Sequence, residues 1–181
     1  MEHKLVPFGI LEVCDDELTI IFGTSRETSD FIVDCLHYWW DASKKHYPHI
    51  RQLVINLDNG PDVASSRTQF MKRMVEFATS TGLEIILAYY PPYHSKYNPI
   101  ERCWGILEMH WNGALLDSVE SALNWAATMT WRGIRPAIHL MDKLYQKGVS
   151  VAKKAFKQIE ACLERHETLP KYGVRILPAP A

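Results

Sequence analysis

Hydrophobic and polar positions alternate between strand-like and helical patterns along the first part of the chain. Two runs rich in β-branched and aromatic residues, 5–13 and 18–22, flank a short acidic segment and predict a β-hairpin. Residues 29–47 carry apolar side chains at helical spacing and stop at Pro48, which predicts a helix. Residues 52–57, QLVINL, form a nearly continuous apolar run, which is typical of a strand covered on both faces of a sheet.

The alternation of helix and strand continues after this strand. A helix is predicted between a serine cap, Ser65 or Ser66, and Gly82, a residue suited to end it. Residues 84–90 predict the next buried strand. A proline-rich loop follows, and Pro99 suits the first position of another helix, whose apolar face includes two tryptophans that we expect in the core, Trp104 and Trp111.

The last third of the chain shows mainly helical patterns. Helices are predicted at about 118–131, 138–147 and 151–166, followed by a short apolar run at 173–177. A hairpin followed by strands that alternate with helices predicts an α/β fold with a sheet covered by helices. We expect one domain over residues 1–181, with a core at about 1–115 and a helical, basic extension at about 116–181.

Composition supports a folded domain, since 47% of the 181 residues are hydrophobic and 23% are charged. No apolar run approaches the ~20 residues that a membrane helix needs. The four cysteines include no Cys-x-x-Cys pair, and the first residues are charged rather than apolar. We therefore expect a protein of the reducing cytoplasm that does not engage a membrane.

Charge is distributed unevenly along the chain. Residues 1–131 carry a net charge of -7, whereas residues 132–181 carry +6, with 10 Lys and Arg against 4 Asp and Glu. An acidic body with a basic tail is compatible with a metal site beside a phosphate-binding surface. Solvated surface charge is the other explanation, and the pattern taken by itself favours it.

Two acidic residues are candidates for chemistry, and each also has a local structural explanation. Asp58 follows the predicted strand 52–57, at the strand end where α/β sheets gather functional residues. It also begins an Asp-Asn-Gly sequence, in which an aspartate often bonds its own backbone. Glu101 lies in the first turn of the next helix, but Asn98-x-x-Glu101 is a capping-box pattern, which would occupy its carboxylate.

The combined string favours the functional interpretation. LVINLDNGP, followed after about forty residues by YYPPYHSKYNPIERCWG, resembles the catalytic core of DDE transposases of mariner-like bacterial insertion sequences. The chain is most similar to the Rhodopirellula-type transposase family, from KLVPFGILEV to LPKYGVRI. The resemblance implies a ribonuclease H-like fold, a mixed sheet flanked by helices, and metal-dependent cleavage and strand transfer on DNA.

The resemblance also implies a set of site residues. Asp58 would be the second metal-binding carboxylate and Glu101 the third, holding two Mg²⁺ ions about 3.5–4 Å apart, with Mn²⁺ as a substitute. His94 and Lys96, in the loop before Glu101, would contact DNA at the transposon ends and the target.

One part of the family pattern is missing. The family's first carboxylate is an aspartate on the first, central strand, which would precede the hairpin at 5–22. The acids nearest to the start border the hairpin turn, where we expect solvated side chains: Glu12, Asp15, Asp16 and Glu17.

We therefore expect the C-terminal part of a longer transposase, inactive by itself. Without the central strand, two sheet edges would lack a partner, unless the hairpin pairs with the strand before Asp58 or another chain fills the gap. An upstream transposase segment or a second copy in a homodimer would supply it.

Two other functions remain open at this point. The first is a non-enzymatic remnant that acts as a DNA-binding or assembly module, and the second is a ribonuclease H-like nuclease with another substrate. An acidic residue within about 5 Å of both Asp58 and Glu101 would favour the enzyme, because the ions must be shared at that range. Steeply salt-dependent DNA binding is the expected property of the module.

Overall fold

The chain forms two compact units in a computed structural model that describes residues 5–114 and 116–180. Unit 1 comprises Met1–Glu27 and Lys96–Tyr145, and unit 2 comprises Thr28–Ser95 and Gln146–Ala181. The start of the chain, including Lys4 where the family resemblance begins, lies outside the described residues. Each unit contains one mixed sheet with helices, which confirms the predicted ribonuclease H-like α/β class.

The sheet of unit 1 has the strand order β1-β2-β5. The predicted hairpin is confirmed as β1 (Val6–Glu12) and β2 (Glu17–Gly23), which pair antiparallel, while β5 (Ala137–Met141) pairs parallel to β2. The helix predicted at 138–147 is wrong, because its first part is this strand. A short apolar run does not distinguish a helix from a strand by periodicity, and pairing with β2 decides the outcome here.

Two helices belong to unit 1, α3 (Pro99–Trp111) and α4 (Val119–Ala126). Pro99 opens α3 as predicted. Trp104 and Trp111 are partly buried against the core of the unit, which confirms that they pack rather than project freely. The buried residues of that core come from β2, α3, α4 and the segment after α4: Leu18, Ile20, Phe22, Cys103, Leu107, Ala126, Met129 and Trp131.

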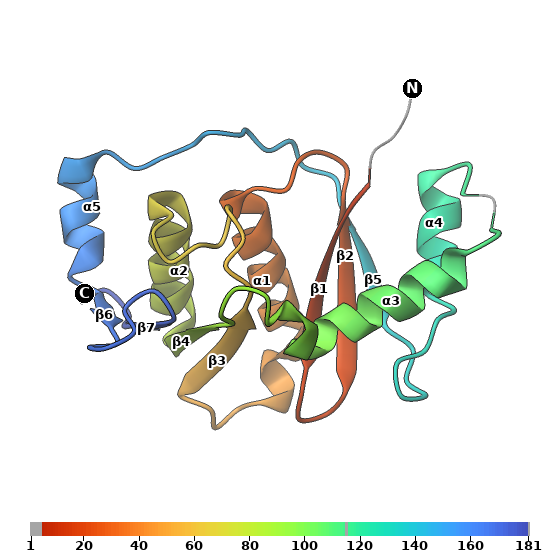
Figure 1. Cartoon of the computed structure of the whole chain (residues 1–181), viewed down its shortest axis with the longest axis horizontal. Helices are drawn as coiled ribbons and strands as arrows, with labels where there is room; N and C mark the ends of the chain where they lie inside the picture. Colours follow the sequence, from red (N-terminus) through yellow and green to blue (C-terminus); the bar gives the residue numbers. More distant parts are fainter. Residues whose placement is uncertain (1–4, 115, 181) are drawn as a thin grey trace. The chain divides into compact units, whose positions relative to one another are not determined.

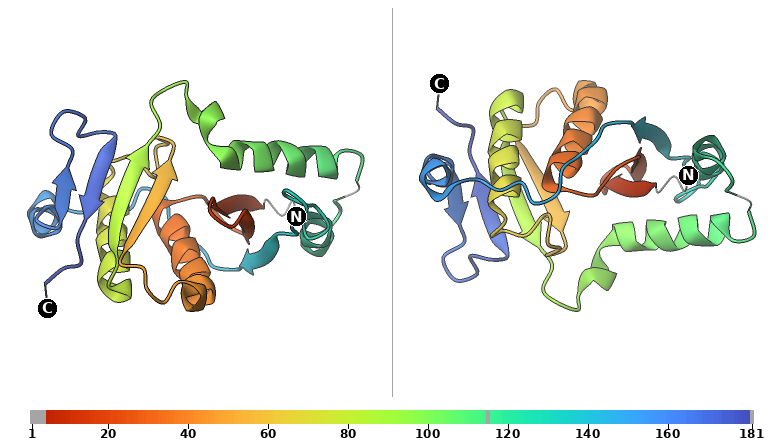
Figure 2. Two further views of the ribbon diagram at one scale, coloured as in Figure 1. Left: turned by 90° about the horizontal axis from the view of Figure 1, so that it is seen from below. Right: turned by 90° about the horizontal axis from the view of Figure 1, so that it is seen from above.

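The sheet of unit 2 has the strand order β3-β4-β7-β6, visible at one side of the views in Figure 2. β3 (Gln52–Leu57) and β4 (Glu84–Tyr89) lie parallel. Parallel neighbours need a long crossover connection, and the segment between these two strands contains a helix. β7 (Gly173–Ile176) pairs antiparallel with β4 and with β6 (Leu163–Arg165). The predicted extension at 116–181 therefore contains three strands as well as helices.

β3 is an edge strand of its sheet, and the expectation that both of its faces are covered is wrong. Its residues alternate between exposed and half-buried, and Val54 is 54% exposed. β1 is likewise an edge strand of the sheet of unit 1. Within the described residues β1 pairs with β2 in unit 1, and β3 pairs with β4 in unit 2.

The helices of unit 2 are α1 (Ser29–Ser43), α2 (Thr68–Thr81) and α5 (Lys153–Glu160), with a 3₁₀ turn, η1 (Lys44–His46), after α1. α1 and α2 pack side by side, and α2 also contacts β4, β7 and α5 (Figures 1 and 2). Large side chains from these elements are fully buried: Phe31, Ile32, Phe70, Met71, Met74, Phe77, Ile85 and Leu87.

The predicted ends of these helices are only partly right. Gly82 ends α2 in the left-handed conformation, with φ of 71°, as expected. The predicted serine cap is wrong, since Arg67 occupies the N-cap position and makes no capping bond with its side chain. The helix predicted at 151–166 ends at Glu160, because the following residues form β6 beside β7. Every helix in the described residues falls short of the length and apolarity needed to span a membrane.

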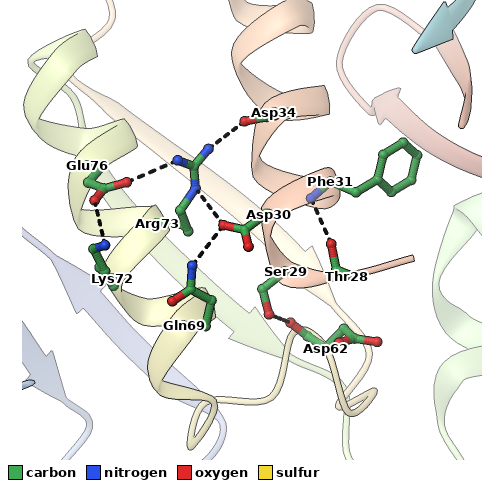
Figure 3. Close-up of polar contacts among 10 residues, drawn as sticks. All are labelled: Thr28, Ser29, Asp30, Phe31, Asp34, Asp62, Gln69, Lys72, Arg73 and Glu76. Carbon is green, nitrogen blue, oxygen red and sulfur yellow. Dashed lines mark hydrogen bonds and ion pairs between the residues drawn. The ribbon is translucent and has the colours of Figure 1, made fainter. Parts of the chain in front are cut away.

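A cluster of charged side chains joins α1 to α2 (Figure 3). The Arg73 guanidinium on α2 forms ion pairs with Asp30 and Asp34 on α1 and with Glu76 on its own helix. Gln69 Nε2 donates a hydrogen bond to Asp30, at 2.8 Å. One arginine thus neutralises acidic side chains of two helices that would otherwise repel each other.

Replacement of Arg73 by alanine is expected to lower the free energy of unfolding by about 1–2 kcal/mol, because it leaves two half-buried carboxylates without their cation. Lys72→Ala is the matched control, since its ion pair with Glu76 is much more exposed and is worth at most about 0.5 kcal/mol. Urea denaturation of both variants measures the difference. Equal losses in the two variants would contradict this role of Arg73.

A second cluster lies across the strands of unit 2. Arg175 on β7 donates two hydrogen bonds to Glu84 on β4, each 2.7 Å long, and a third to Glu164 on β6. Gln52 on β3 also donates to Glu84. The hydrogen bonds from Arg175 and Gln52 lower the pKa of the Glu84 carboxyl. Glu84 therefore contributes stability while it is ionised.

This lowered pKa predicts a pH dependence of stability. The contribution of Glu84 is fully present above the ordinary glutamate pKa of about 4.3, and it is lost as the pH falls below that value through the lower pKa of the folded state. Glutamate carboxyls usually titrate between about pH 5 and pH 3. Over this range the wild-type chain should lose more stability than the Glu84→Gln variant, because the glutamine side chain does not titrate. Urea midpoints measured across this range test the expectation, and parallel curves would refute it.

Candidate active site

Asp58 stands at the carboxyl end of β3, in unit 2. The strand ends at Leu57, whose carbonyl accepts a hydrogen bond from the Tyr90 N–H just after β4, at 2.8 Å. The two parallel strands therefore stay in register up to the residue before Asp58. The Asp58 side chain is exposed. A carboxylate in this position faces water and accessible ligands rather than the core.

The loop that follows Asp58 is anchored at two points. The Ser29 hydroxyl, at the start of α1, donates to the carbonyl of Asp62 at 2.7 Å (Figure 3). The Tyr89 hydroxyl, at the end of β4, donates to the carbonyl of Val63 at 2.7 Å. Val63 itself is buried. The backbone that carries Asp58 is thus fixed on one side by the sheet and on the other by these two bonds.

The turn explanation for Asp58 does not describe the structure. The hydrogen-bonded turn begins at Gly60, where the Val63 N–H donates to the Gly60 carbonyl at 3.2 Å. Within the described part of the chain, no hydrogen bond joins the Asp58 carboxylate to its own backbone. A Cβ at Gly60 would lie 3.4 Å from Asp58 Oδ1, so glycine at this position leaves room beside the carboxylate. Both carboxylate oxygens are available to a ligand.

Glu101 lies in the first turn of α3, in unit 1, and its side chain is exposed. Asn98 is the N-cap residue of this helix, but its side chain makes no capping hydrogen bond. The helix start instead uses a backbone bond, from the Glu101 N–H to the Asn98 carbonyl at 3.1 Å. The capping box expected from Asn98-x-x-Glu101 is therefore not formed, and among the described residues the Glu101 carboxylate has no ion pair.

The helix that carries Glu101 is held closely against β1. A Cβ at Gly9 of β1 would lie 2.7 Å and 2.8 Å from two atoms of the Trp104 ring, so only glycine permits this approach. Cys103 and Leu107 are buried on the same helix. Burial raises the pKa of the Cys103 thiol to about 11. The thiol is therefore protonated at neutral pH, and Cys103 packs in the buried core of unit 1.

The two acids lie in different units, Asp58 in unit 2 and Glu101 in unit 1, and their joint site remains a prediction. Each offers an unpartnered carboxylate, the oxygen donor that Mg²⁺ and Mn²⁺ prefer. No cluster of three or more histidine, cysteine, aspartate or glutamate residues suited to a metal ion is found in the described residues. The fit of the chain to such ions therefore depends on these two carboxylates.

The predicted DNA-contacting residues lie in the loop between β4 and α3. His94 is exposed, and its Nδ1 lies 2.9 Å from the Pro92 carbonyl. Lys96 is exposed in a short 3₁₀ turn, η2 (Ser95–Tyr97), with its ammonium 5.2 Å from the centre of the Tyr97 ring. Both side chains are accessible to a phosphate, and their contact with DNA stays a prediction.

Two residues that position Asp58 were not among the sequence-based candidates, Ser29 and Tyr89. Ser29 was assigned only to the start of a helix, and Tyr89 only to a buried strand. Their hydroxyls reach the loop after β3 through folding, across 33 and 26 residues of sequence. Burial raises the pKa of Tyr89, so that its hydroxyl remains a donor throughout the physiological range.

Comparison with known proteins places these residues in a family context. A family model described as the Rhodopirellula transposase DDE domain matches residues 1–178. No curated protein and no solved structure matches the chain. The match covers both units, including Asp58 and Glu101.

Proposed function

Because the chain belongs to the Rhodopirellula transposase DDE domain family, we propose that it provides two metal-binding carboxylates, Asp58 and Glu101, for cleavage and strand transfer on transposon DNA. The observation that supports this proposal most is that both carboxylates are exposed and free of the local bonds that would explain them structurally. Asp58 also lies at the carboxyl end of a strand, where ligand sites of α/β folds gather.

The chemistry follows from these donors. Asp58 and Glu101 would hold divalent ions, which would supply activation of the attacking oxygen and stabilisation of the leaving oxygen of a phosphodiester. Asp58 provides one donor from the anchored end of β3. Glu101 provides the other from the first turn of α3, a helix fixed by its contact with Gly9. His94 and Lys96 bind the DNA backbone and so orient the scissile phosphate.

A third carboxylate completes the proposed site from a further strand. β1 and β3 are both edge strands in the described residues, and an edge strand offers unpaired N–H and C=O groups to another strand. The apolar, half-exposed sequence of β3 suits a strand with neighbours on both sides. We propose that a further transposase segment or a second copy of the chain supplies this strand, so the chain alone is expected to be inactive.

A cleavage assay tests the proposed function. The chain alone and the chain extended by the upstream coding sequence are incubated with a duplex that carries the end of the element, with Mg²⁺, with Mn²⁺ or with EDTA. We expect strand cleavage by the extended chain only, and only with a metal ion. Salt-dependent DNA binding by both forms without cleavage by either would support the non-enzymatic remnant, and cleavage of unrelated nucleic acids would support a general nuclease.

A further inference from the structure

The loop before α3 contains a tight turn with an unusual residue. The His94 N–H donates to the Pro91 carbonyl at 3.1 Å and closes a four-residue turn, Pro91 to His94. Its third residue, Tyr93, has φ of 65°, in the left-handed region. A proline at the second position with a positive φ at the third defines a type II turn, in which glycine is strongly favoured at the third position.

The Tyr93 side chain gains nothing from the fold that would offset this backbone conformation. Its ring is 95% exposed, the most exposed of the large hydrophobic side chains in the described residues. A glycine would satisfy the turn without strain, and an asparagine would tolerate it. The turn therefore presents a large aromatic ring to solvent, at a position where the ring is unfavourable for the backbone.

The turn is also rigid in the way that a binding surface requires. Pro91 and Pro92 restrict the backbone before Tyr93, and the closing hydrogen bond fixes the residue after it. The adjacent His94 ring is held near the Pro92 carbonyl. A restricted backbone reduces the conformational entropy that is lost when a planar ligand stacks on the ring it carries.

We propose that Tyr93 stacks on an unpaired nucleotide base of the DNA substrate, next to the strand that is cut. This inference rests on the proposed function, which identifies DNA as the partner. It adds a contact to a base, whereas the proposed contacts of His94 and Lys96 are to the phosphate backbone. Bases within a duplex have both faces covered by their neighbours. The ring therefore selects a base that is extrahelical or single-stranded, as occurs at a cleaved or distorted transposon end.

Binding of the wild-type chain and three variants to two DNA probes tests the proposal. The probes are a duplex with one extrahelical 2-aminopurine and the same duplex fully paired, measured in EDTA. Tyr93→Gly should bind the extrahelical probe about 5- to 150-fold more weakly, the range for loss of one base–aromatic stack. Tyr93→Phe should bind within about twofold of wild type, because stacking needs the ring and not the hydroxyl. Tyr97→Ala is the control for a neighbouring exposed tyrosine.

Several outcomes would overturn the proposal. The first is an equal loss of affinity for both probes, which would indicate a general phosphate effect. The second is a lower urea midpoint for Tyr93→Gly than for wild type, since the turn predicts an equal or higher one. The third is a loss of self-association in Tyr93→Gly without a change in DNA binding, which would indicate a second copy as the partner.

The proposed function can fail separately from this inference. Probe binding in EDTA needs no metal ion, so its outcome does not depend on whether Asp58 and Glu101 are metal ligands. If Tyr93→Gly loses the extrahelical probe while Asp58→Asn and Glu101→Gln in the extended transposase keep normal metal-dependent cleavage, the stacking role stands and the assigned carboxylates do not. If the wild-type chain binds neither probe, the stacking role is overturned.

Discussion

Asp58→Asn and Glu101→Gln should each reduce metal-dependent DNA cleavage by the extended transposase by about 100-fold or more, without lowering its stability. Both substitutions keep the shape of the side chain and remove the charge. A carboxylate that holds a metal ion stabilises the charge that develops during phosphoryl transfer, and loss of one such group typically costs about 10²–10³ in rate. The expected loss of rate is measured in single-turnover cleavage with saturating Mg²⁺.

The free energy of unfolding should be unaffected by these two substitutions, because the Asp58 and Glu101 carboxylates are exposed. Neither carboxylate is engaged in a hydrogen bond or ion pair with the described residues, so its neutralisation changes the free energy of unfolding by no more than about 0.5 kcal/mol. Rate loss together with an unchanged urea midpoint therefore distinguishes a functional acid from a structural one.

Two nearby acids provide matched controls. Asp62 lies four residues after Asp58 in the same loop, and Glu108 lies on the exposed face of α3 with Glu101. Asp62→Asn and Glu108→Gln make the same chemical changes in the same elements. Both should retain cleavage within about threefold of wild type, the level expected for surface substitutions away from a site. Comparable losses in the controls would show that overall charge, and not these two ligands, limits the rate.

The sequence predicts the elements that depend on local signals. The hairpin, the strand at 52–57 and the helix starting at Pro99 all occur where expected, because turn residues, a bounded apolar run and a proline at a helix start act on the adjacent backbone. These elements also carry Asp58 and Glu101. Local patterns were therefore sufficient to place both acids at the end of a strand and the start of a helix.

The errors arise where distant segments decide the structure. The segment at 137–141 is a strand because β2, more than a hundred residues earlier, pairs with it. The anchoring of the Asp58 loop by Ser29 and Tyr89 has the same non-local origin.

The second large effect is expected at Gly9, where β1 approaches the helix that carries Glu101. Gly9→Ala should lower the free energy of unfolding by about 1–3 kcal/mol, the usual cost of adding a methyl group to a tightly packed contact. The new Cβ would lie 2.7 Å from a Trp104 ring carbon, and that ring is packed against the core of unit 1 and has little freedom to move. Urea denaturation followed by tryptophan fluorescence measures the loss.

Gly105 gives the opposite expectation from the same substitution. It lies within α3, one residue after Trp104, and a Cβ there would meet no atom within 4 Å. Gly105→Ala should therefore raise stability by about 0.5–1 kcal/mol, because alanine loses less backbone entropy than glycine in a helix. Opposite signs for two glycine-to-alanine changes in contacting elements would show that packing, and not glycine content, controls this region.

A double-mutant cycle separates the contact itself from other effects of the substitution. If the Gly9 methyl group destabilises by pressing on the indole, Trp104→Phe should remove much of the penalty, so that the double variant is more stable than the sum of the single effects by about 0.5–3 kcal/mol. Additive effects would mean that the methyl group acts elsewhere on β1.

Because α3 presents Glu101 in its first turn, Gly9→Ala should also slow cleavage by the extended transposase, and Trp104→Phe should restore part of that rate. If the cleavage rate and the free energy of unfolding change in parallel in these variants, the position of the Glu101 carboxylate depends on the close packing of β1 against α3.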